Sequence, residues 1–401
     1  GSLSGLPLDI PLALTGSCAR RTPRGMSETE LVVGAGAVIA LRLFDVAYAI
    51  DLARAERLWA GQARSSSRLR LTATPPKAMA FGVPPLALAL DPIALELGGD
   101  SVSAAVTARL YDFGAISIAL RVPVAGAAWS GFVRRLNQTE QAAGGSTAGG
   151  LWGRLLAQVR APLMAALERP QAHSTIEEDY LIGLVQSFDQ PLSAAALLQR
   201  VDLVPLLSGE QRALSDGARQ ELLRQRFSYY TDDLVVLTWD RAFIYEPRGD
   251  SDVMDVLEVA NAQLLEMRYY DELLDDELPR MYDLVERARR RSSVFASRRF
   301  AELARGLYTL VAEVTELTER VDNALQVTED VYLARIYAAA LELFRVRPVS
   351  AAVDRKLSII RDTYTALHDE ASSRRAELME FLITVLIVIE VVLALVPLLH
   401  R

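Results

Sequence analysis

The sequence predicts an α+β domain that is followed by long, coiled-coil-like α-helices and by one C-terminal transmembrane helix. Three observations lead to this fold class. Between residues 38 and 250 the apolar residues form short, often alternating runs separated by Gly and Pro, a pattern typical of strands and short helices. Between residues 251 and 375 they recur every three or four positions, as on helices. The last apolar run, Phe381–Leu399, is nineteen residues long and carries one charge, Glu390.

The first domain mixes strands and helices in no regular order. Pro92 interrupts one expected strand, and a turn at residues 112–114 joins two others. Strands are predicted over residues 42–52, 68–72, 86–97, 106–123, 177–188 and 227–247, and helices over 127–141 and 151–168. Because there is no strict strand–helix–strand repeat, we expect an α+β domain over residues 38–250. We expect residues 1–25 to be a disordered leader.

Residues 251–375 have the pattern of long helices packed side by side. Residues 252–291 alone would form a helix of roughly 60 Å, which Pro279 should kink because proline removes a backbone donor. Farther along, a heptad seam with the 3.5-residue period of a coiled coil consists of Leu303, Leu307, Leu310, Val314, Leu317 and Val321. Such seams predict a homo-oligomer, although a bundle within one chain would satisfy them as well.

The terminal run is predicted to cross a membrane. As a helix, its nineteen residues cover roughly 28 Å, close to the hydrocarbon thickness of about 30 Å. Arg374 and Arg375 precede the run, and His400 and Arg401 end the chain. Arginines on the upstream side place the N-terminal bulk in the cytoplasm. These features predict a tail-anchored topology with a single C-terminal span.

Glu390 lies near the centre of the predicted span. A charged carboxylate there costs about 2.5–3.5 kcal/mol on insertion scales, and it would regain part of this by hydrogen bonding to another copy. Three interpretations remain open: a protonated side chain without a role, a contact between spans, and a ring of carboxylates in a conducting oligomer.

Composition and motifs point to no catalytic chemistry. The net charge of −8 argues against general nucleic-acid binding. Cys18 is the single cysteine, and the three histidines do not have metal-ligand spacing. The segment "VVGAGAVIA" (32–40) lacks the third glycine of a dinucleotide loop, and "YDFG" (111–114) stands without the other kinase motifs. We therefore expect no enzyme activity, no cofactor and no metal, and we identify no small-molecule substrate.

A local basic patch is the exception to the acidic composition. It consists of Arg287, Arg289, Arg290, Arg291, Arg298 and Arg299. The patch is either the solvated end of a helix, where the dipole favours arginine, or a site for an anionic partner such as RNA or a ribosome. Only Lys77 and Lys356 among the 43 basic residues are lysines, a bias that indicates a GC-rich, bacterial genome and hence a bacterial inner (plasma) membrane.

Five segments carry a resemblance to a known family. They are "YDFGAISIAL" (111–120), "YYTDDLVVLTWDRAFIYEP" (229–247), "VMDVLEVANAQLLEMRYYDELLDDELPRMYDLVERA" (253–288), "TEDVYLARIYAAALELFRV" (328–346) and "RRAELMEFLITVLIVIEVVLALV" (374–396). Through them, in order over about residues 40–399, the chain resembles the DUF-155 domain family. These are the "required for meiotic nuclear division" proteins of yeast and animal mitochondria and their bacterial relatives. The resemblance implies a membrane-anchored oligomer without known catalysis, one mitochondrial member of which is implicated in organellar translation.

Pattern and resemblance lead to one main functional hypothesis. The chain is expected to be a non-enzymatic, tail-anchored, self-associating scaffold or tether that holds a cytoplasmic partner, for example one linked to translation, at the membrane. The alternative is an oligomeric, transport- or channel-like protein that uses Glu390 within the span. A third hypothesis is an enzyme whose site lies in the α+β domain.

Overall fold

The computed structural model describes residues 30–61, 66–68, 83–144, 150–170, 176–210, 212–249, 252–290 and 331–399, with a few further positions between 305 and 315. By its internal contacts the chain divides into two units, of which the larger begins at Leu31. The predicted leader over residues 1–25 lies outside the described residues. All described helices and strands belong to the larger unit.

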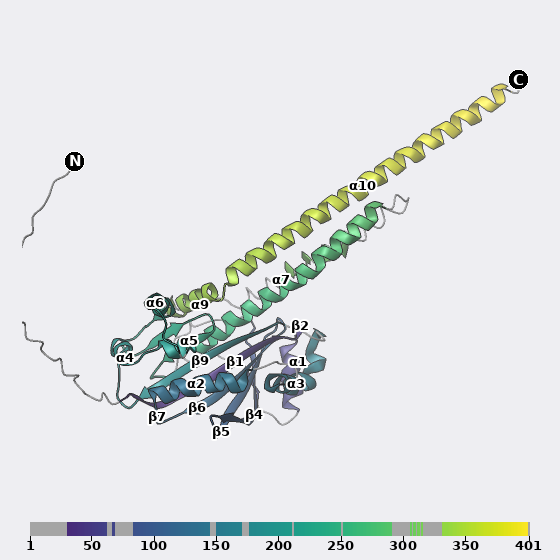
Figure 1. Ribbon diagram of the computed structural model, residues 1–401. Coiled ribbons are helices and arrows are strands. Elements are labelled where there is room, and N and C mark those ends of the chain that lie inside the picture. Colours follow the sequence, from purple (N-terminus) through teal and green to yellow (C-terminus); the bar gives the residue numbers. More distant parts are fainter. Residues whose placement is uncertain are drawn as a thin grey trace, which may run out of the picture. The chain divides into compact units, whose positions relative to one another are not determined.

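A large sheet is the centre of the fold (Figure 1). Its strand order is β10-β11-β12-β9-β1-β6-β5-β4-β3, with the short β7 paired to β1. The bounds are β1 (Val32–Asp45), β3 (Ser66–Arg68), β4 (Leu86–Leu97), β5 (Asp100–Leu110), β6 (Ala115–Val124), β7 (Ala127–Ala128), β9 (Glu177–Phe188), β10 (Gln225–Phe227), β11 (Leu234–Leu237) and β12 (Arg241–Tyr245). β12 is parallel to β9, whereas the other neighbours are antiparallel. β2 (Ala47–Ile50) and β8 (Leu167–Pro170) form a separate small sheet.

The sheet is buried on both faces in its middle. Ile39 and Leu41 of β1 belong to one apolar core, whereas Val38 and Ala40 belong to another. Successive side chains of a strand point to opposite faces. A strand that is apolar at every position must therefore lie between two layers. This large mixed sheet confirms the α+β prediction for the N-terminal part of the chain.

Short helices cover one face of the sheet. They are α1 (Leu52–Ala60), α2 (Trp129–Ala143), α3 (Leu151–Leu163), α4 (Ala194–Arg200) and α5 (Val204–Ser208), with η1 (Met164–Ala166) after α3 and α6 (Asp216–Leu222) farther along the chain. Side-chain oxygens accept backbone hydrogen bonds where α1, α4 and α6 begin, at Asp51, Ser193 and Ser215. Such N-caps satisfy donors that have no partner within the helix.

Two predicted strands agree closely with the structure. β9 has the expected bounds, and β4 has a register shift between Leu90 and Ile93, where Pro92 cannot donate a ladder hydrogen bond. The predicted hinge between two strands is the tight turn between β5 and β6. Gly114 in this turn has φ +102°, and a Cβ at this position would lie 1.8 Å from the Ala47 carbonyl oxygen. Only glycine fits there.

Long helices cover the other face. α7 (Val253–Arg290) packs on β1, β9 and β6, and it also contacts α9 (Val331–Leu343) and α10 (Val346–Leu399). The Tyr337 hydroxyl of α9 donates to Gln263 Oε1 of α7 at 2.6 Å. Lys356 Nζ of α10 lies 2.6 Å from Asp271 Oδ1 and 2.7 Å from Asp275 Oδ1 of α7. The helices thus share one apolar core with the sheet.

The predicted transmembrane helix is corrected by the structure. In the part of the chain that is described, no helix is long and apolar enough to cross a membrane. The prediction of a tail-anchored membrane protein in an inner membrane was therefore wrong. The hypotheses of a membrane tether and of a channel that uses Glu390 both require this span, so they are wrong as well.

A buried arginine joins three elements on the short-helix face. Arg241 of β12 is 4% exposed, and its Nη1 donates to Asn137 Oδ1 and to the Leu206 carbonyl, both at 2.9 Å. Its Nη2 donates to Glu140 Oε2 at 2.6 Å. The guanidinium therefore connects α2, α5 and the sheet through charge-assisted hydrogen bonds.

We expect Arg241→Ala to lower the free energy of unfolding by about 3 kcal/mol, because it leaves the buried Leu206 carbonyl without this donor and removes the partner of Asn137 and Glu140 on α2. Urea unfolding followed by circular dichroism measures this. Arg280→Ala is the matched control, since Arg280 is exposed and pairs with Glu277 within the same helix, and it should change the value by less than about 0.5 kcal/mol. Equal stability of the two variants would contradict the role of Arg241.

Candidate functional site

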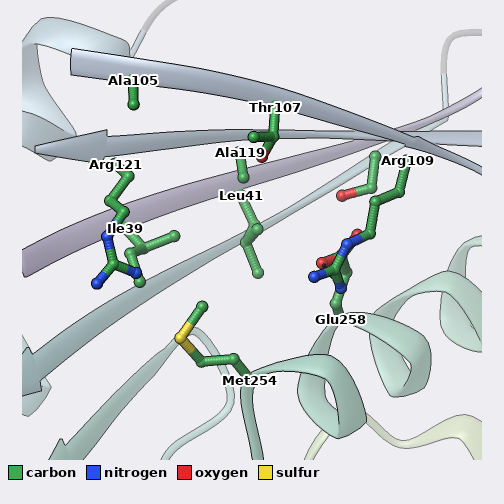
Figure 2. A pocket seen from close by; sticks show the side chains of 10 residues that line it. Ile39, Leu41, Ala105, Thr107, Arg109, Ala119, Arg121, Met254 and Glu258 are labelled. Atoms are coloured by element: carbon green, nitrogen blue, oxygen red, sulfur yellow. Dashed lines mark hydrogen bonds and ion pairs between the residues drawn. The ribbon is translucent and has the colours of Figure 1, made fainter. Parts of the chain in front are cut away.

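A groove lies on the long-helix face of the sheet, where α7 leaves β5 uncovered. Its volume is about 210 Å³. We call it the α7 groove, and its lining consists of Ile39, Leu41, Ala105, Thr107, Arg109, Ser117, Ala119, Arg121, Met254 and Glu258 (Figure 2). Eight of these residues come from strands β1, β5 and β6, and Met254 and Glu258 come from the start of α7.

The strand register explains why these residues meet. Arg121 of β6 lies between Ile39 of β1 and Ala105 of β5. Two residues earlier in β6, Ala119 lies between Leu41 and Thr107, and a further two residues earlier, Ser117 lies opposite Arg109. Residues two apart on a strand share a face. The centre of the floor is therefore formed by Leu41, Ala119 and Thr107, with one arginine at each end.

The two arginines are too far apart to share partners. Arg121 and Ser117, which pairs with Arg109, are four residues apart on β6, so their Cα atoms are separated by roughly 13 Å. Figure 2 shows Arg109 directed toward Glu258, whereas Arg121 lies on the other side of Ile39 and Leu41. The groove therefore has two ends with different electrostatics.

The Arg109 end is neutralised within the protein. Arg109 Nη1 lies 2.6 Å from Asp255 Oδ1 and 2.7 Å from Glu258 Oε2, and the Tyr111 hydroxyl donates to Glu258 Oε1 at 3.1 Å. Burial raises the pKa of Glu258, and the positive charge of Arg109 counteracts part of this effect. Burial opposes the charge of Arg109, yet the Glu258 and Asp255 carboxylates raise its pKa above the ordinary value. This network fastens α7 to β5.

The Arg121 end carries an unpaired charge. Arg121 is half-buried, and none of the described residues offers its guanidinium a hydrogen bond or an ion pair. Burial alone lowers its pKa, with no carboxylate to offset the effect. A charge that loses water without gaining a partner is costly. The groove can therefore attract an anion at this end.

A second buried network lies under α7 and contains more than one acid. Glu266 and Asp45 are 2% and 3% exposed, and Tyr270 of α7 is fully buried beside them. Burial raises the pKa of Glu266 well above its usual range, and the nearby charges of Asp45 and Asp112 raise it further. No group of three or more possible metal ligands occurs in the described part of the chain. We therefore assign this network to the contact between helix and sheet rather than to a site.

A larger and more polar groove of about 730 Å³ lies near the turn between β11 and β12. Trp239 in this turn is 71% exposed. Among the groove's charged groups, Arg268 pairs with Glu178, and Arg224 pairs with Glu221 at 3.4 Å. These two pairs engage four of the seven charged side chains that line this groove. We consider the α7 groove the stronger candidate site because it combines a single unsatisfied guanidinium, judged among the described residues, with a mostly apolar lining.

The residues singled out from the sequence lie elsewhere. Phe381 and Glu390 are exposed on α10, whereas the side chain of Leu399 lies outside the described residues. The basic patch over residues 287–299 also lies outside the described side chains, so its role stays a prediction. Of the heptad seam only Val314 is described, and it is buried in the core shared with the sheet.

Sequence reasoning missed Arg109 and Arg121. The sequence did contain a signal for them. The predicted turn at residues 112–114 pairs the strands on either side of it, and this pairing places Arg109 and Arg121 on the same face of the sheet. No local signal brings Glu258 and Asp255 of α7 to the same place. Their contact with Arg109 spans 149 residues of sequence for Glu258 and depends on how α7 packs.

Comparison with known proteins places the sheet region in a family. A family model described as the N-terminal domain of the uncharacterized protein MJ0711 matches residues 35–252. The chain belongs to this family. The uncharacterized protein MJ0711 of Methanocaldococcus jannaschii is 25% identical to the chain over 194 residues, which cover 48% of this chain and 58% of that protein. The matched part is thus little more than half of this relative's length. No solved structure matches the chain.

The family match includes the strands of the α7 groove but not its helical wall. Residues 35–252 contain all eight strand residues of the lining, whereas Met254 and Glu258 follow the end of the match. The sheet face with its two arginines is therefore part of the matched domain. The uncharacterized relative brings no activity to the site.

We expect Glu266→Gln to gain stability relative to the wild type as the pH rises. The folded-state pKa of Glu266 is raised, so above the unfolded-state value of about 4.3 the folded protein retains a proton that the unfolded chain releases. This contribution is fully present below about pH 4 and is lost as the pH rises toward the folded-state pKa. A glutamine side chain does not titrate, so the variant has no such dependence.

Urea unfolding of both proteins at pH 5, 6, 7 and 8 tests this expectation. The stability of the variant minus that of the wild type should increase steadily across the series. Glu96→Gln is the control, because Glu96 is exposed on β4, and its difference should stay flat. A constant difference for Glu266→Gln would show that its carboxyl has no raised pKa.

Proposed function

We propose that the chain is a small-molecule-binding protein and that the α7 groove is its binding site. The observation that carries this proposal is Arg121, which is half-buried beside a mostly apolar floor and has no partner among the described residues. Binding sites of this kind combine apolar surface with a few polar groups that fix the orientation of a ligand. The Arg109 network supports the proposal because it holds one wall of the groove in place before a ligand arrives.

The polar groups of the groove favour binding over catalysis. A guanidinium stays protonated at any ordinary pH and transfers no proton. Glu258 is the one carboxylate of the lining, and Arg109 and Tyr111 already engage both of its oxygens. Ser117 and Thr107 supply hydroxyls, but no lining residue is a histidine that could activate them.

Blocking the groove should abolish binding. Ala105 is exposed on β5 within the lining, so Ala105→Trp would fill the groove without entering the core. Saturation-transfer NMR with a panel of acidic, basic and neutral fragments should find ligands of the wild type that Ala105→Trp no longer binds. We expect their affinity to fall at least tenfold.

Ala94→Trp is the matched control. Ala94 is exposed on β4 and pairs with Ser103, which lies on the same face as Ala105 but outside the lining. This variant should keep the wild-type binding profile. If every fragment binds Ala105→Trp and Ala94→Trp alike, the groove is not a binding site.

A second proposal concerns association with another copy of the chain, supported by an exposed apolar segment of α10. Its apolar side chains are between 47% and 68% exposed at Met379, Phe381, Leu382, Ile383, Leu386, Ile387, Val388, Ile389 and Val391. Monomeric proteins seldom leave so much contiguous apolar surface in water. Pairing of two such helices would bury it.

Mass photometry tests this proposal. We expect Ile387→Asp to weaken association by about tenfold or more, because one buried isoleucine contributes about 1.5–3 kcal/mol. Ile359→Asp is the control, since Ile359 is a similarly exposed apolar residue, 41% exposed, outside the segment. A monomeric wild type, or equal effects of both substitutions, would rule out this interface.

We further propose that the matched family is related to the DUF-155 proteins. The support is that two of the resembling segments, residues 111–120 and 229–247, fall inside the match over residues 35–252. The bacterial source stays a prediction from the scarcity of lysine.

A further inference from the structure

We propose that the α7 groove binds an apolar monocarboxylate, whose carboxylate pairs with Arg121 and whose body lies on the mostly apolar floor. This inference rests on the proposed binding function and names the class of ligand. It follows from three properties of the groove: one cation without a partner among the described residues, a mostly apolar centre and a limited volume.

The unpaired cation selects an anion with one charged head. Guanidinium matches a carboxylate in a planar, two-point hydrogen bond. Arg121 has no hydrogen-bond or ion-pair partner among the described residues, so a ligand carboxylate would remove the cost of its burial. In a half-buried position this pair is screened by salt less than a pair on the surface.

The Arg109 network excludes a second anionic head. Asp255 and Glu258 already occupy the guanidinium of Arg109. A dicarboxylate that spans the groove would place its second charge near these two carboxylates, where the described lining offers no second unpaired cation. Inorganic phosphate has no apolar body to cover the floor. The electrostatics of the groove thus favour a single negative charge at the Arg121 end.

The floor selects an apolar body. Between the two arginines lie Leu41, Ala119 and Thr107. Ile39 lies beside Arg121, and Met254 of α7 faces these residues across the groove (Figure 2). Met is a flexible, polarizable side chain that adapts to the shape of an apolar group. Thr107 is the one of these five side chains with a hydrogen-bonding atom, so a sugar or a polar amide would bury most of its polar groups there without partners.

The volume limits the size of the ligand. The groove of about 210 Å³ is somewhat larger than the engineered apolar cavity of about 150 Å³ that binds benzene. The ligand then has on the order of seven to ten non-hydrogen atoms. Linear acids such as hexanoate and compact ones such as benzoate fall in this range.

Isothermal titration calorimetry of the wild-type chain at pH 7 tests the charge requirement. The probes are hexanoate, its neutral isostere hexanamide, hexylamine and inorganic phosphate. We expect hexanoate to bind most tightly and hexanamide about tenfold to hundredfold more weakly, the range of a hydrogen-bonded charge. Hexylamine and phosphate should bind more weakly still. Binding of hexanamide as tight as that of hexanoate, or tighter binding of phosphate, would overturn the proposal.

Two variants assign the effect to the named residue. In Arg121→Gln the affinity for hexanoate should fall to the value for hexanamide, and the affinity for hexanamide should stay unchanged. Arg134→Gln is the matched control, because Arg134 is exposed on α2, which packs on the other face of the sheet, and it should bind hexanoate as the wild type does. If Arg121→Gln keeps the wild-type affinity for hexanoate, the carboxylate does not pair with Arg121.

A chain-length series tests the floor. From butanoate to hexanoate each added methylene should raise the affinity about fourfold, as expected for a buried CH₂. The gain should end near octanoate, when the groove is full. An affinity independent of chain length would overturn the apolar subsite.

Different results would contradict the binding function and the ligand class. If fragments bind and Ala105→Trp removes them, but neither the charge of the probe nor Arg121→Gln changes the affinity, the binding function stands and the monocarboxylate class is wrong. If no fragment responds to Ala105→Trp, the binding function itself is wrong.

Discussion

The contact between Arg109 and the first turns of α7 is the interaction on which the arrangement of this protein depends. It joins a strand of the sheet to a helix that begins far along the chain, and it does so with two carboxylates, Asp255 and Glu258, on one guanidinium. Charges this well buried are tolerated only when they are paired. The network therefore fixes the rotation of α7 as well as its position, because another rotation would leave Arg109 and Glu258 buried without partners.

The position of α7 determines where the sheet is open. The helix covers β1 and β9 and part of β6, and it leaves the outer face of β5 exposed at Ala105 and Thr107. Arg121 lies where this cover ends. Its guanidinium is desolvated by the neighbouring apolar side chains, yet it is out of reach of the carboxylates that serve Arg109. An open site next to a rigid ion network is pre-organised, so a ligand would have little to reorder on binding.

The terminal run shows how an apolar pattern can be interpreted in more than one way. Its density of Leu, Ile and Val predicted a span, and the described helices contain none. What the structure shows instead is an apolar surface on the side of α10 at residues 379–391. Glu390 is exposed there. The feature to be explained in this part of the chain is therefore an exposed apolar surface. It is not a charge buried in lipid.

The sequence by itself determined the local elements and the class of the fold. Alternation and turn residues predicted β4, β9 and the β5–β6 hairpin around Gly114, and the three- and four-residue spacing predicted a helix over the length of α7. These features depend on contacts between residues that are close in sequence, and the spacing of the apolar residues along the sequence reflects such contacts. The tertiary structure alone decided that α7 packs on the sheet, that Arg109 meets Glu258, and that Arg121 is left without a partner among the described residues. Such pairings join residues more than a hundred positions apart, and their energies depend on which charges burial brings together.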